Sequence, residues 1–284
     1  MRVAVLGIGA MGSRIAASLL TAGHAISIWN RTADRAAPLA AQGARLAGTP
    51  AEAAQDAEVV LAMVRDDMAS RRVWLAPDDG VLASADPQAL AIDCSTLSVG
   101  WARELSAACA ARGMGFLDAP VVGSRAQAEA RTLIHLVGGE VGSFARAAPI
   151  FNATGRAAHH VGPAGAGAAL KLLVNAALGT QVALMAELLA AAERFGLDPA
   201  RAMEVAAETP AFSPTAVAAA RAMLARSFEP AFPVDLIRKD LDYLLCAAVE
   251  DRAPVATATR DVFARAASAG LGALNMTAVA KLYA

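Results

Sequence analysis

Short apolar runs alternate with helical patterns along the first 162 residues, and this alternation constrains the fold more than any other feature of the sequence. Four such runs, rich in β-branched and other apolar residues, occupy 3–6, 25–30, 58–64 and 88–93. Strands and helices in regular alternation predict a parallel sheet with helices on both faces. Three further short strands are expected at 115–120, 133–139 and 157–162. We therefore expect a doubly wound, Rossmann-like α/β domain over residues 1–162.

The alternation stops after Gly162, and no further strand pattern follows it. Asp198-Pro199 and Ser213-Pro214 each pair an N-cap side chain with a proline at the first helical position. The first helix after the boundary is expected to end near Phe195, after about 28 residues or about 42 Å at 1.5 Å per residue. Residues 163–284 are thus predicted to form an all-helical second domain, entered by a long interdomain helix.

Charge and cysteine usage limit the partners and the compartment. The chain has 25 basic and 26 acidic residues, a net charge of −1, so it offers no electrostatic reason to expect nucleic acid or an anionic membrane surface as a partner. Its three cysteines are scattered, which indicates reduced thiols. The N-terminus shows no signal-peptide cleavage pattern, so we expect a cytoplasmic protein.

One segment has the length of a membrane span. Residues 161–186 carry a single charge, Lys171, and a span needs about 20 apolar residues. However, the segment opens with "GPAGAG", is dominated by Ala and Gly, and contains Asn175 and Gln181. A lysine well inside a bilayer would cost several kcal/mol. We expect a helix buried between protein surfaces.

The sequence "GIGAMG" at 7–12 has the form G-x-G-x-x-G, follows a predicted strand and opens a predicted helix. In that context Gly7 makes a tight turn, Gly9 lets a pyrophosphate approach the backbone, and Gly12 lets helix and strand pack closely. The helix N-terminus faces the phosphates. The predicted dinucleotide contacts of this turn are Gly7, Ile8, Gly9, Ala10, Met11 and Gly12.

The end of the second strand discriminates between NAD and NADP. An NAD site usually has an acidic residue there, which accepts hydrogen bonds from the ribose. This chain has Asn30, followed by Arg31 and Thr32, whose donors suit the oxygens of a 2′-phosphate. The alternative is an ordinary solvated loop arginine. The pattern favours NADP(H) over NAD(H).

Five motifs now stand in one order: "GIGAMG", "WNRT", "DAPVVGS", "GAGAALKLLVN" and "RKDL". In order and spacing the sequence resembles the β-hydroxyacid dehydrogenases over nearly its whole length. The resemblance implies hydride transfer between a nicotinamide and a small β-hydroxy acid, a semialdehyde or a 2-oxo acid. It also implies Lys171 as the catalytic acid/base, with Asn175 one turn later. The cofactor contacts that it adds are Met63, Val64, Ser95, Thr96 and Lys239.

Lys171 and Asn175 are four residues apart and would share one face of a helix. Beside a nicotinamide, Lys171 could give a proton to a carbonyl oxygen as hydride reaches the carbon, and the reverse step would make it a base. Burial among apolar side chains should lower its pKa toward the operating pH. The alternative is a lysine whose stem lies on apolar surface while its head reaches water.

The segment 118–139 should lie at the carboxyl edge of the sheet, where a ligand would bind. Asp118 could be only a turn residue. Most sequences of the resembled family have a serine where this chain has Val122, which donates no hydrogen bond. Either the amides of Gly123 and Ser124, with the Ser124 hydroxyl, take over the substrate's anion, or the substrate is less polar; we expect a partial takeover. Phe232 could cap the substrate or fill the core.

Several alternatives stay open. The chain could reduce imines or bulky carbonyls, although the resembled imine-reducing proteins usually lack the helix lysine. It could also be a non-catalytic NADP-binding interaction module. His159 and His160 would point to opposite faces of a strand, so no metal is expected. Apolar faces in the 163–284 region suggest a homodimer or homotetramer.

Overall fold

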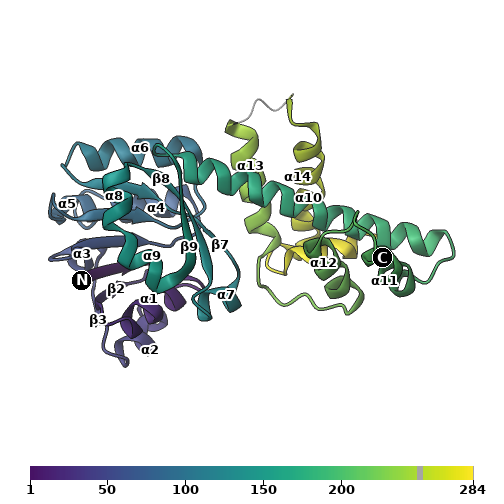
Figure 1. Cartoon of the computed structure of the whole chain (residues 1–284), viewed down its shortest axis with the longest axis horizontal. Helices are drawn as coiled ribbons and strands as arrows, with labels where there is room; N and C mark the ends of the chain where they lie inside the picture. Colours follow the sequence, from purple (N-terminus) through teal and green to yellow (C-terminus); the bar gives the residue numbers. More distant parts are fainter. Residues whose placement is uncertain (248–251, 284) are drawn as a thin grey trace. The chain divides into compact units, whose positions relative to one another are not determined.

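The computed structural model describes residues 1–247 and 252–283, and its contacts divide the chain into two compact units, Met1–Lys171 and Leu172–Ala284 (Figure 1). We call them the sheet unit and the helical unit. The division falls inside one long helix, α10 (Ala166–Arg194), whereas the sequence placed the boundary just before it. The first turns of α10 belong to the sheet unit because they pack against it: a Cβ atom at Gly167 would lie 2.3 Å from the carbonyl oxygen of Leu136.

The sheet has the strand order β3-β2-β1-β4-β5-β6-β8-β7, with β9 paired to β8. All pairings from β3 to β6 are parallel, which confirms the predicted Rossmann-like sheet. By contrast, β8 runs antiparallel to β6 and β7. The strands are β1 (Arg2–Leu6), β2 (Ala25–Trp29), β3 (Arg45–Leu46), β4 (Val59–Ala62), β5 (Leu90–Asp93), β6 (Gly115–Asp118), β7 (Val121–Val122), β8 (Leu133–Gly139) and β9 (Gly155–Gly162).

Helices cover both faces of this sheet. Val5 of β1 points into a core shared with α1 and α9, while the next residue, Leu6, points into a core shared with α4 and α6. Alternate residues of a strand face opposite sides, so strands that are apolar at every position build both cores. The helices are α1 (Gly12–Thr21), α2 (Ala37–Ala40), α3 (Pro50–Ala54), α4 (Asp67–Leu75), α5 (Val81–Ser84), α6 (Val99–Ala110), α7 (Arg125–Glu129), α8 (Val141–Arg146) and α9 (Ala148–Thr154).

The helical unit contains, after α10, the helices α11 (Pro199–Ala207), α12 (Pro214–Leu224), α13 (Val234–Ala247) and α14 (Pro254–Ala266). Asp198 and Ser213 cap α11 and α12 as predicted, accepting hydrogen bonds from Ala200 and Ala216. Within the described part of this unit, β-pairing is limited to one isolated bridge between Pro233 and Asn275. The prediction of an all-helical second domain is confirmed.

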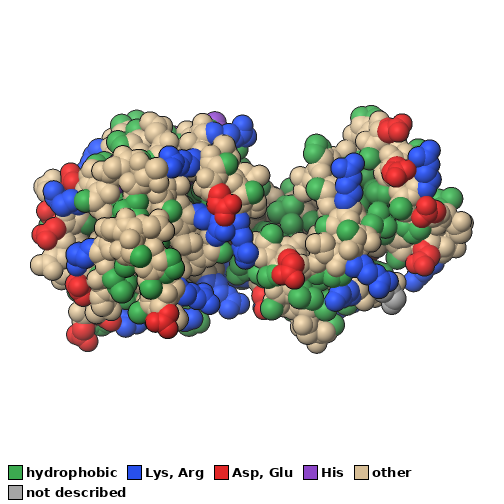
Figure 2. Space-filling view, turned by 90° about the horizontal axis from the view of Figure 1, so that it is seen from below, with side chains coloured by type: hydrophobic (Ala, Val, Ile, Leu, Met, Phe, Trp, Pro, Cys, Tyr) green, Lys and Arg blue, Asp and Glu red, His purple; other side chains and the backbone are tan. Residues whose placement is uncertain are grey.

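The composition of α10 would also suit a membrane span, and 44% of its most apolar window is buried inside the protein. Val182, Met185 and Leu189 pack into the core of the helical unit. This packing is the one expected of a helix buried in a protein. On the face that Figure 2 displays, basic and acidic side chains are interspersed on each unit.

Candidate active site

The glycine-rich turn between β1 and α1 has two glycines that the turn itself requires. Gly7 has φ 97°, and a Cβ atom there would lie 2.3 Å from the carbonyl oxygen of Met63. A Cβ atom at Gly12 would lie 1.9 Å from the carbonyl oxygen of Gly7. Gly9 differs, because a Cβ atom there would meet none of the atoms that the structure describes within 4 Å. The space above Gly9, at the start of α1, is the cradle that a pyrophosphate needs.

Gly9→Ala is therefore expected to weaken dinucleotide binding about tenfold or more without lowering the melting temperature. The added methyl group meets open space in the protein but occupies the approach of the phosphates, and one lost charge-assisted hydrogen bond costs about 1.5–3 kcal/mol. Fluorescence titration and thermal unfolding measure the two quantities. Gly142→Ala is the matched control, since Gly142 is also in open space but lies in α8. An unchanged Kd in Gly9→Ala would contradict the assignment of the turn.

Asn30 holds this turn in place. Its Oδ1 accepts a hydrogen bond from the Ile8 amide at 3.0 Å, and its Nδ2 donates to the carbonyl oxygen of Thr32 at 2.8 Å. Arg31 and Thr32 are exposed at the end of β2. The sequence predicted Asn30 only as a neutral replacement for an acid, and its link to Ile8 is an additional role.

Arg14 is a second residue that the sequence did not single out. Its guanidinium donates to the carbonyl oxygen of Ala10 at 2.7 Å and pairs with Glu129 of α7 at 2.6 Å. The glycine-rich turn is thereby joined to α7, the short helix that follows Ser124. The pair is partly exposed, so its contribution to stability is small and its effect is on geometry.

The loops after β4 and β5 lie at the same edge of the sheet as the turn. Met63 donates its amide to the carbonyl oxygen of Leu6, so the β4 loop continues directly beside the end of β1. The Val64 amide donates to the Ser95 hydroxyl oxygen at 2.8 Å, and Ser95 is buried. Thr96 is half-buried beside it. The structure thus gathers the predicted cofactor residues of the sheet unit at one edge.

Asp118, at the end of β6, is more than a turn residue. Its carboxylate accepts hydrogen bonds from the amides of Gly165 and Ala168, both at 2.7 Å, and so caps the start of α10. Burial raises the pKa of this carboxyl to about 6, and the hydrogen bonds from those amides oppose the rise. The helix that carries Lys171 is in this way anchored to the sheet.

Lys171 is half-buried, and Asn175 lies one turn later on the same side of α10. Asn175 is 2% exposed, and its Nδ2 donates to Oδ2 of Asp240 at 2.6 Å. Oδ1 of the same carboxylate pairs with Nζ of Lys239 at 2.7 Å. Lys239 Nζ also lies 4.5 Å from the ring centroid of Tyr243. Asp240, which the sequence analysis did not single out, organises two of the predicted site residues.

In the predicted substrate segment, the donors of Ser124 are engaged. The Ser124 amide and the Ser124 hydroxyl both donate to Oε1 of Gln127, which caps the short helix α7. Val122 is half-buried in β7, and Gly123 has φ 135°. An anion can use the donors of Ser124 only by displacing Gln127.

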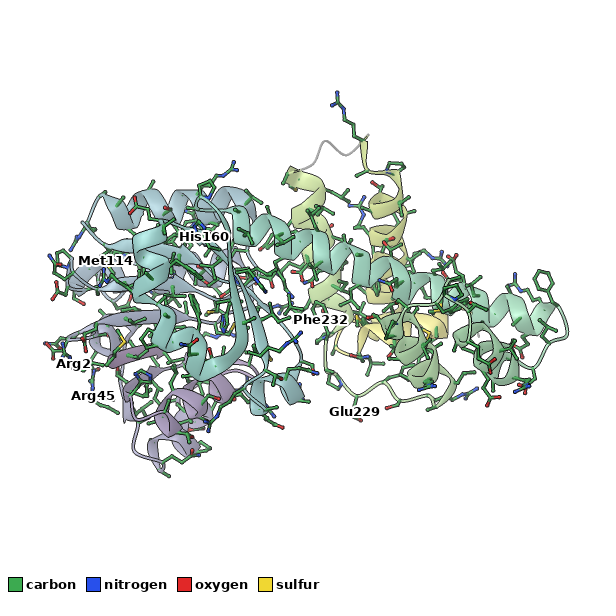
Figure 3. The ribbon with its side chains drawn as sticks, viewed as in Figure 1. Arg2, Arg45, Met114, His160, Glu229 and Phe232 are labelled. Atoms are coloured by element: carbon green, nitrogen blue, oxygen red, sulfur yellow. The ribbon has the colours of Figure 1, made fainter. Side chains whose placement is uncertain are left out.

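Phe232 lies in the segment that leads into α13 (Figure 3), and its half-buried side chain packs against the core of the helical unit. This is the core-filling role, one of the two that the sequence allowed. His160 lies on β9 (Figure 3) and its Nε2 contacts the carbonyl oxygen of Gly139. Among the described residues, no group of three or more His, Cys, Asp or Glu side chains could hold a metal ion.

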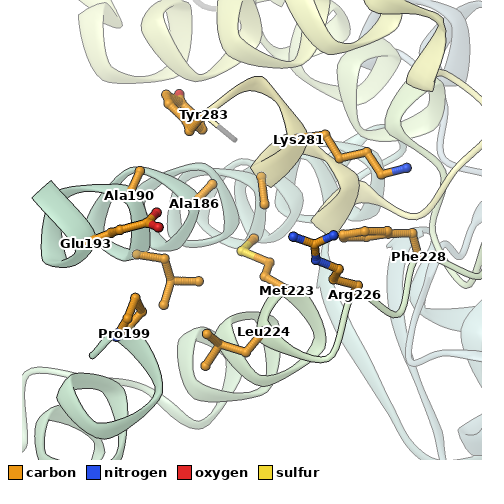
Figure 4. Close-up of a pocket in the computed structure, with 12 residues that line it drawn as sticks. Ala186, Ala190, Glu193, Pro199, Met223, Leu224, Arg226, Phe228, Lys281 and Tyr283 are labelled. Carbon is orange, nitrogen blue, oxygen red and sulfur yellow. The ribbon is translucent and has the colours of Figure 1, made fainter. Parts of the chain in front are cut away.

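A cavity of about 340 Å³ lies within the helical unit (Figure 4). Its lining is mostly apolar, with Glu193, Arg226 and Lys281 as the charged members. The predicted catalytic and cofactor residues are not among the residues that line it. The cavity is therefore separate from the predicted site residues.

Comparison with known proteins decides the family. Residues 2–162 match the model of the NAD binding domain of 6-phosphogluconate dehydrogenase, and residues 165–283 match the NAD-binding domain of NADP-dependent 3-hydroxyisobutyrate dehydrogenase. The 3-hydroxyisobutyrate dehydrogenase of Pseudomonas aeruginosa is 35% identical over 99% of this chain and 98% of its own length. The chain belongs to the β-hydroxyacid dehydrogenase family.

Two further similarities bear on this β-hydroxyacid dehydrogenase. The structure of Mycobacterium tuberculosis 3-hydroxyisobutyrate dehydrogenase with L-serine has a TM-score of 0.90 and 32% identity, covering 99% of this chain and 98% of the other. The human cytokine-like nuclear factor N-PAC is 31% identical over 99% of this chain but only 51% of its own length. The family resemblance noted from the motifs is confirmed, and with it an NAD(P)-dependent dehydrogenase or reductase.

Proposed function

We propose that this β-hydroxyacid dehydrogenase uses NADPH to reduce a small semialdehyde or 2-oxo acid, and oxidises the corresponding hydroxy acid in reverse. The observation that carries the proposal is the pair formed by Lys171 and Asn175 on one side of α10. Asn175 is held by Asp240, and the start of the helix is held by Asp118. A buried, oriented amide next to a lysine is an arrangement that suits a reacting oxygen.

The nicotinamide supplies or accepts the hydride, and the residues of the chain do the rest. The glycine-rich turn and the start of α1 hold the pyrophosphate. Lys171 gives a proton to the carbonyl oxygen during reduction and takes it back during oxidation. Because Nδ2 of Asn175 donates to Asp240, the amide is fixed in one orientation and can present its Oδ1 to a hydroxyl of the substrate.

A rate assay with NADPH against aldehydes, semialdehydes, 2-oxo acids and cyclic imines tests the proposal. The fastest turnover is expected with the small carboxylated carbonyl compounds. A preference for imines or bulky ketones would support the imine or bulky-carbonyl alternative instead. NADPH binding without turnover of any substrate would support an interaction module.

NADPH is expected to bind about 10- to 150-fold more tightly than NADH. Arg31 and Thr32 are exposed where the 2′-phosphate would lie, and one charge-assisted contact contributes about 1.5–3 kcal/mol. Arg31→Ala should lose most of this difference, and the neighbouring Arg35→Ala, also exposed, is the control. Fluorescence titration of both cofactors measures the effect. Equal affinities in the unsubstituted protein would refute the NADP assignment.

A homodimer or homotetramer formed through the 163–284 region is part of the same proposal. Leu184, Phe195 and Leu197 are exposed apolar side chains at the C-terminal half of α10 and just beyond it. Leu184→Glu is expected to lower the mass measured by light scattering at micromolar concentration. Leu46→Glu, at an exposed site in β3, is the control. A monomeric unsubstituted protein would contradict the prediction.

We further propose a cytoplasmic protein that needs no nucleic-acid or membrane partner. The net charge of −1 and the interspersed charges support this part of the proposal. Fractionation of cells that produce the protein tests it, and recovery in the membrane fraction would count against it.

A further inference from the structure

A fully buried carboxylate lies directly behind the cofactor edge of the sheet and has no place in the chemistry described above. Asp93 is the last residue of β5 and is 0% exposed. Its Oδ2 accepts hydrogen bonds from Ser70 Oγ at 2.7 Å and from Trp74 Nε1 at 2.9 Å. Its Oδ1 accepts from the Ser95 amide at 2.9 Å. Asp93 therefore joins α4 to the loop that follows β5.

The contacts continue from Ser95 to the glycine-rich turn. The Ser95 hydroxyl oxygen accepts the Val64 amide at 2.8 Å, which fixes the loop after β4. The peptide of Met63 and the side chain of Val64 in turn form the floor beneath Gly7, where an added Cβ atom would be 2.3 Å from the Met63 carbonyl oxygen and 3.0 Å from Val64 Cγ1. A continuous series of contacts thus runs from the buried carboxylate to the turn.

Burial of this carboxylate is costly for folding. Removing a carboxylate from water is unfavourable, and burial raises the pKa of Asp93 even though hydrogen bonds from Ser95, Ser70 and Trp74 lower it. Apolar residues of similar volume usually replace buried charged groups without loss of stability. Three donors converge on Asp93 and fix the position of its carboxylate. Through Ser95, this arrangement also fixes the loop at the edge of the sheet where a dinucleotide binds.

We infer that Asp93 is a positioning residue for the dinucleotide: acting through Ser95, it sets the Val64 amide and the loop beneath the glycine-rich turn. The inference rests on the dinucleotide site used by the proposed function. Asp93 itself stays behind the loops and acts on the cofactor only through them.

The test compares variants that each change one contact of the Asp93 carboxylate or of the residues bound to it. Ser95→Ala removes the hydroxyl that links Asp93 to Val64. Asp93→Asn replaces the carboxylate by an amide with a single acceptor oxygen for three donors. Ser70→Ala is the matched control, because it removes a hydrogen bond to Asp93 on the α4 side and leaves the link to Val64 intact. Each protein is measured by NADPH fluorescence titration, by thermal unfolding, and by KM for NADPH and kcat.

We expect Asp93→Asn to raise the Kd and the KM for NADPH about tenfold with kcat little changed, and Ser95→Ala to raise the Kd for NADPH at least as much. The double variant should bind no more weakly than the weaker-binding single variant, because the two substitutions break one link. Ser70→Ala should lower the melting temperature without changing the Kd. Should Asp93→Asn fail to fold, Asp93→Ser is measured in its place, since a hydroxyl likewise cannot satisfy the three donors.

The inference is overturned if Ser95→Ala binds NADPH normally, or if Ser70→Ala weakens binding as much as Ser95→Ala does. Additive losses in the double variant would also overturn it, since the two residues would then act separately. A different outcome concerns the proposed function: an unsubstituted protein that binds neither NADPH nor NADH would refute that function and this inference together.

Discussion

Lys171→Ala is expected to reduce turnover by about 10²–10⁴-fold, the usual contribution of a positioned acid or base. In the proposed mechanism Lys171 gives a proton to the carbonyl oxygen, and a side chain that ends at Cβ has no proton to give. The affinity for NADPH should change little, because the turn around Gly9 that holds the pyrophosphate is intact. Single-turnover rates measured with each protein give the effect on the chemical step directly.

Leu173→Ala provides the control for changes in α10, since Leu173 is 57% exposed on the same helix. It should retain nearly full turnover. Deuterated NADPH shows whether hydride transfer limits the rate in each variant. Near-normal turnover of Lys171→Ala, with a full isotope effect, would show that Lys171 is not the acid or base and only extends its amino group into solvent.

Asp240→Ala is expected to destabilise the protein by about 3–5 kcal/mol, the usual result of removing one partner of a buried ion pair. The substitution deprives Lys239 of a carboxylate at 2.7 Å and Asn175 of an acceptor at 2.6 Å, and Asp240 itself is 2% exposed. Urea unfolding measures the loss. A further consequence is lower kcat at temperatures where the variant is folded, because the amide of Asn175 is then free to rotate.

Asp242→Ala is the matched control on the same helix. Asp242 pairs with Arg238 at 3.2 Å and with Arg260 at 3.4 Å, but its side chain is 35% exposed. Exposed pairs contribute about 0–1 kcal/mol, so this variant should remain close to the parent protein. Equal losses in Asp240→Ala and Asp242→Ala would show that burial of the Asp240 pair has no special role.

The architecture was largely predictable because its signals are local. Apolar runs, N-cap residues and prolines placed most strands and the starts of α11 and α12. Several features escaped, including the short helices α2, α5, α7, α8 and α9. The strands β3 and β7 have two residues each, too few for periodicity to register. β8 runs antiparallel to β6, and an apolar run does not indicate whether a strand is parallel or antiparallel to its neighbour.

The sequence predicted the candidate site as a set of residues, but it did not predict the contacts among them. Motif position indicated Lys171, Asn175 and Lys239, whereas the partner of Asn175 is 65 residues away in the sequence. Asp118 likewise caps α10 across 47 residues. Pairings over such separations leave no local pattern, and only the folded chain reveals them.

Capping signals were read correctly at some positions and incompletely at others. Asp198 and Ser213 cap their helices as expected. At α3, Thr49 accepts the Glu52 amide, and the Glu52 carboxylate accepts the amide of Gly48, one residue before the cap. The serine at 124 and the glutamine at 127 have the spacing of a capping box, which was visible in the sequence. Reading that box would have warned that the donors of Ser124 are already in use.

If a substrate's carboxylate binds at Ser124, as predicted from the sequence, Gln127 competes with it for the same donors. Gln127 is tethered three residues away, so its effective concentration is high. A carboxylate would displace Gln127 from these donors, because its charge makes its hydrogen bonds about twice as strong as those of a neutral amide. A neutral ligand of the same shape gains nothing from the exchange. If the substrate binds there, the turn would select charged ligands over neutral ones, and the Gln127 side chain would set the strength of that selection.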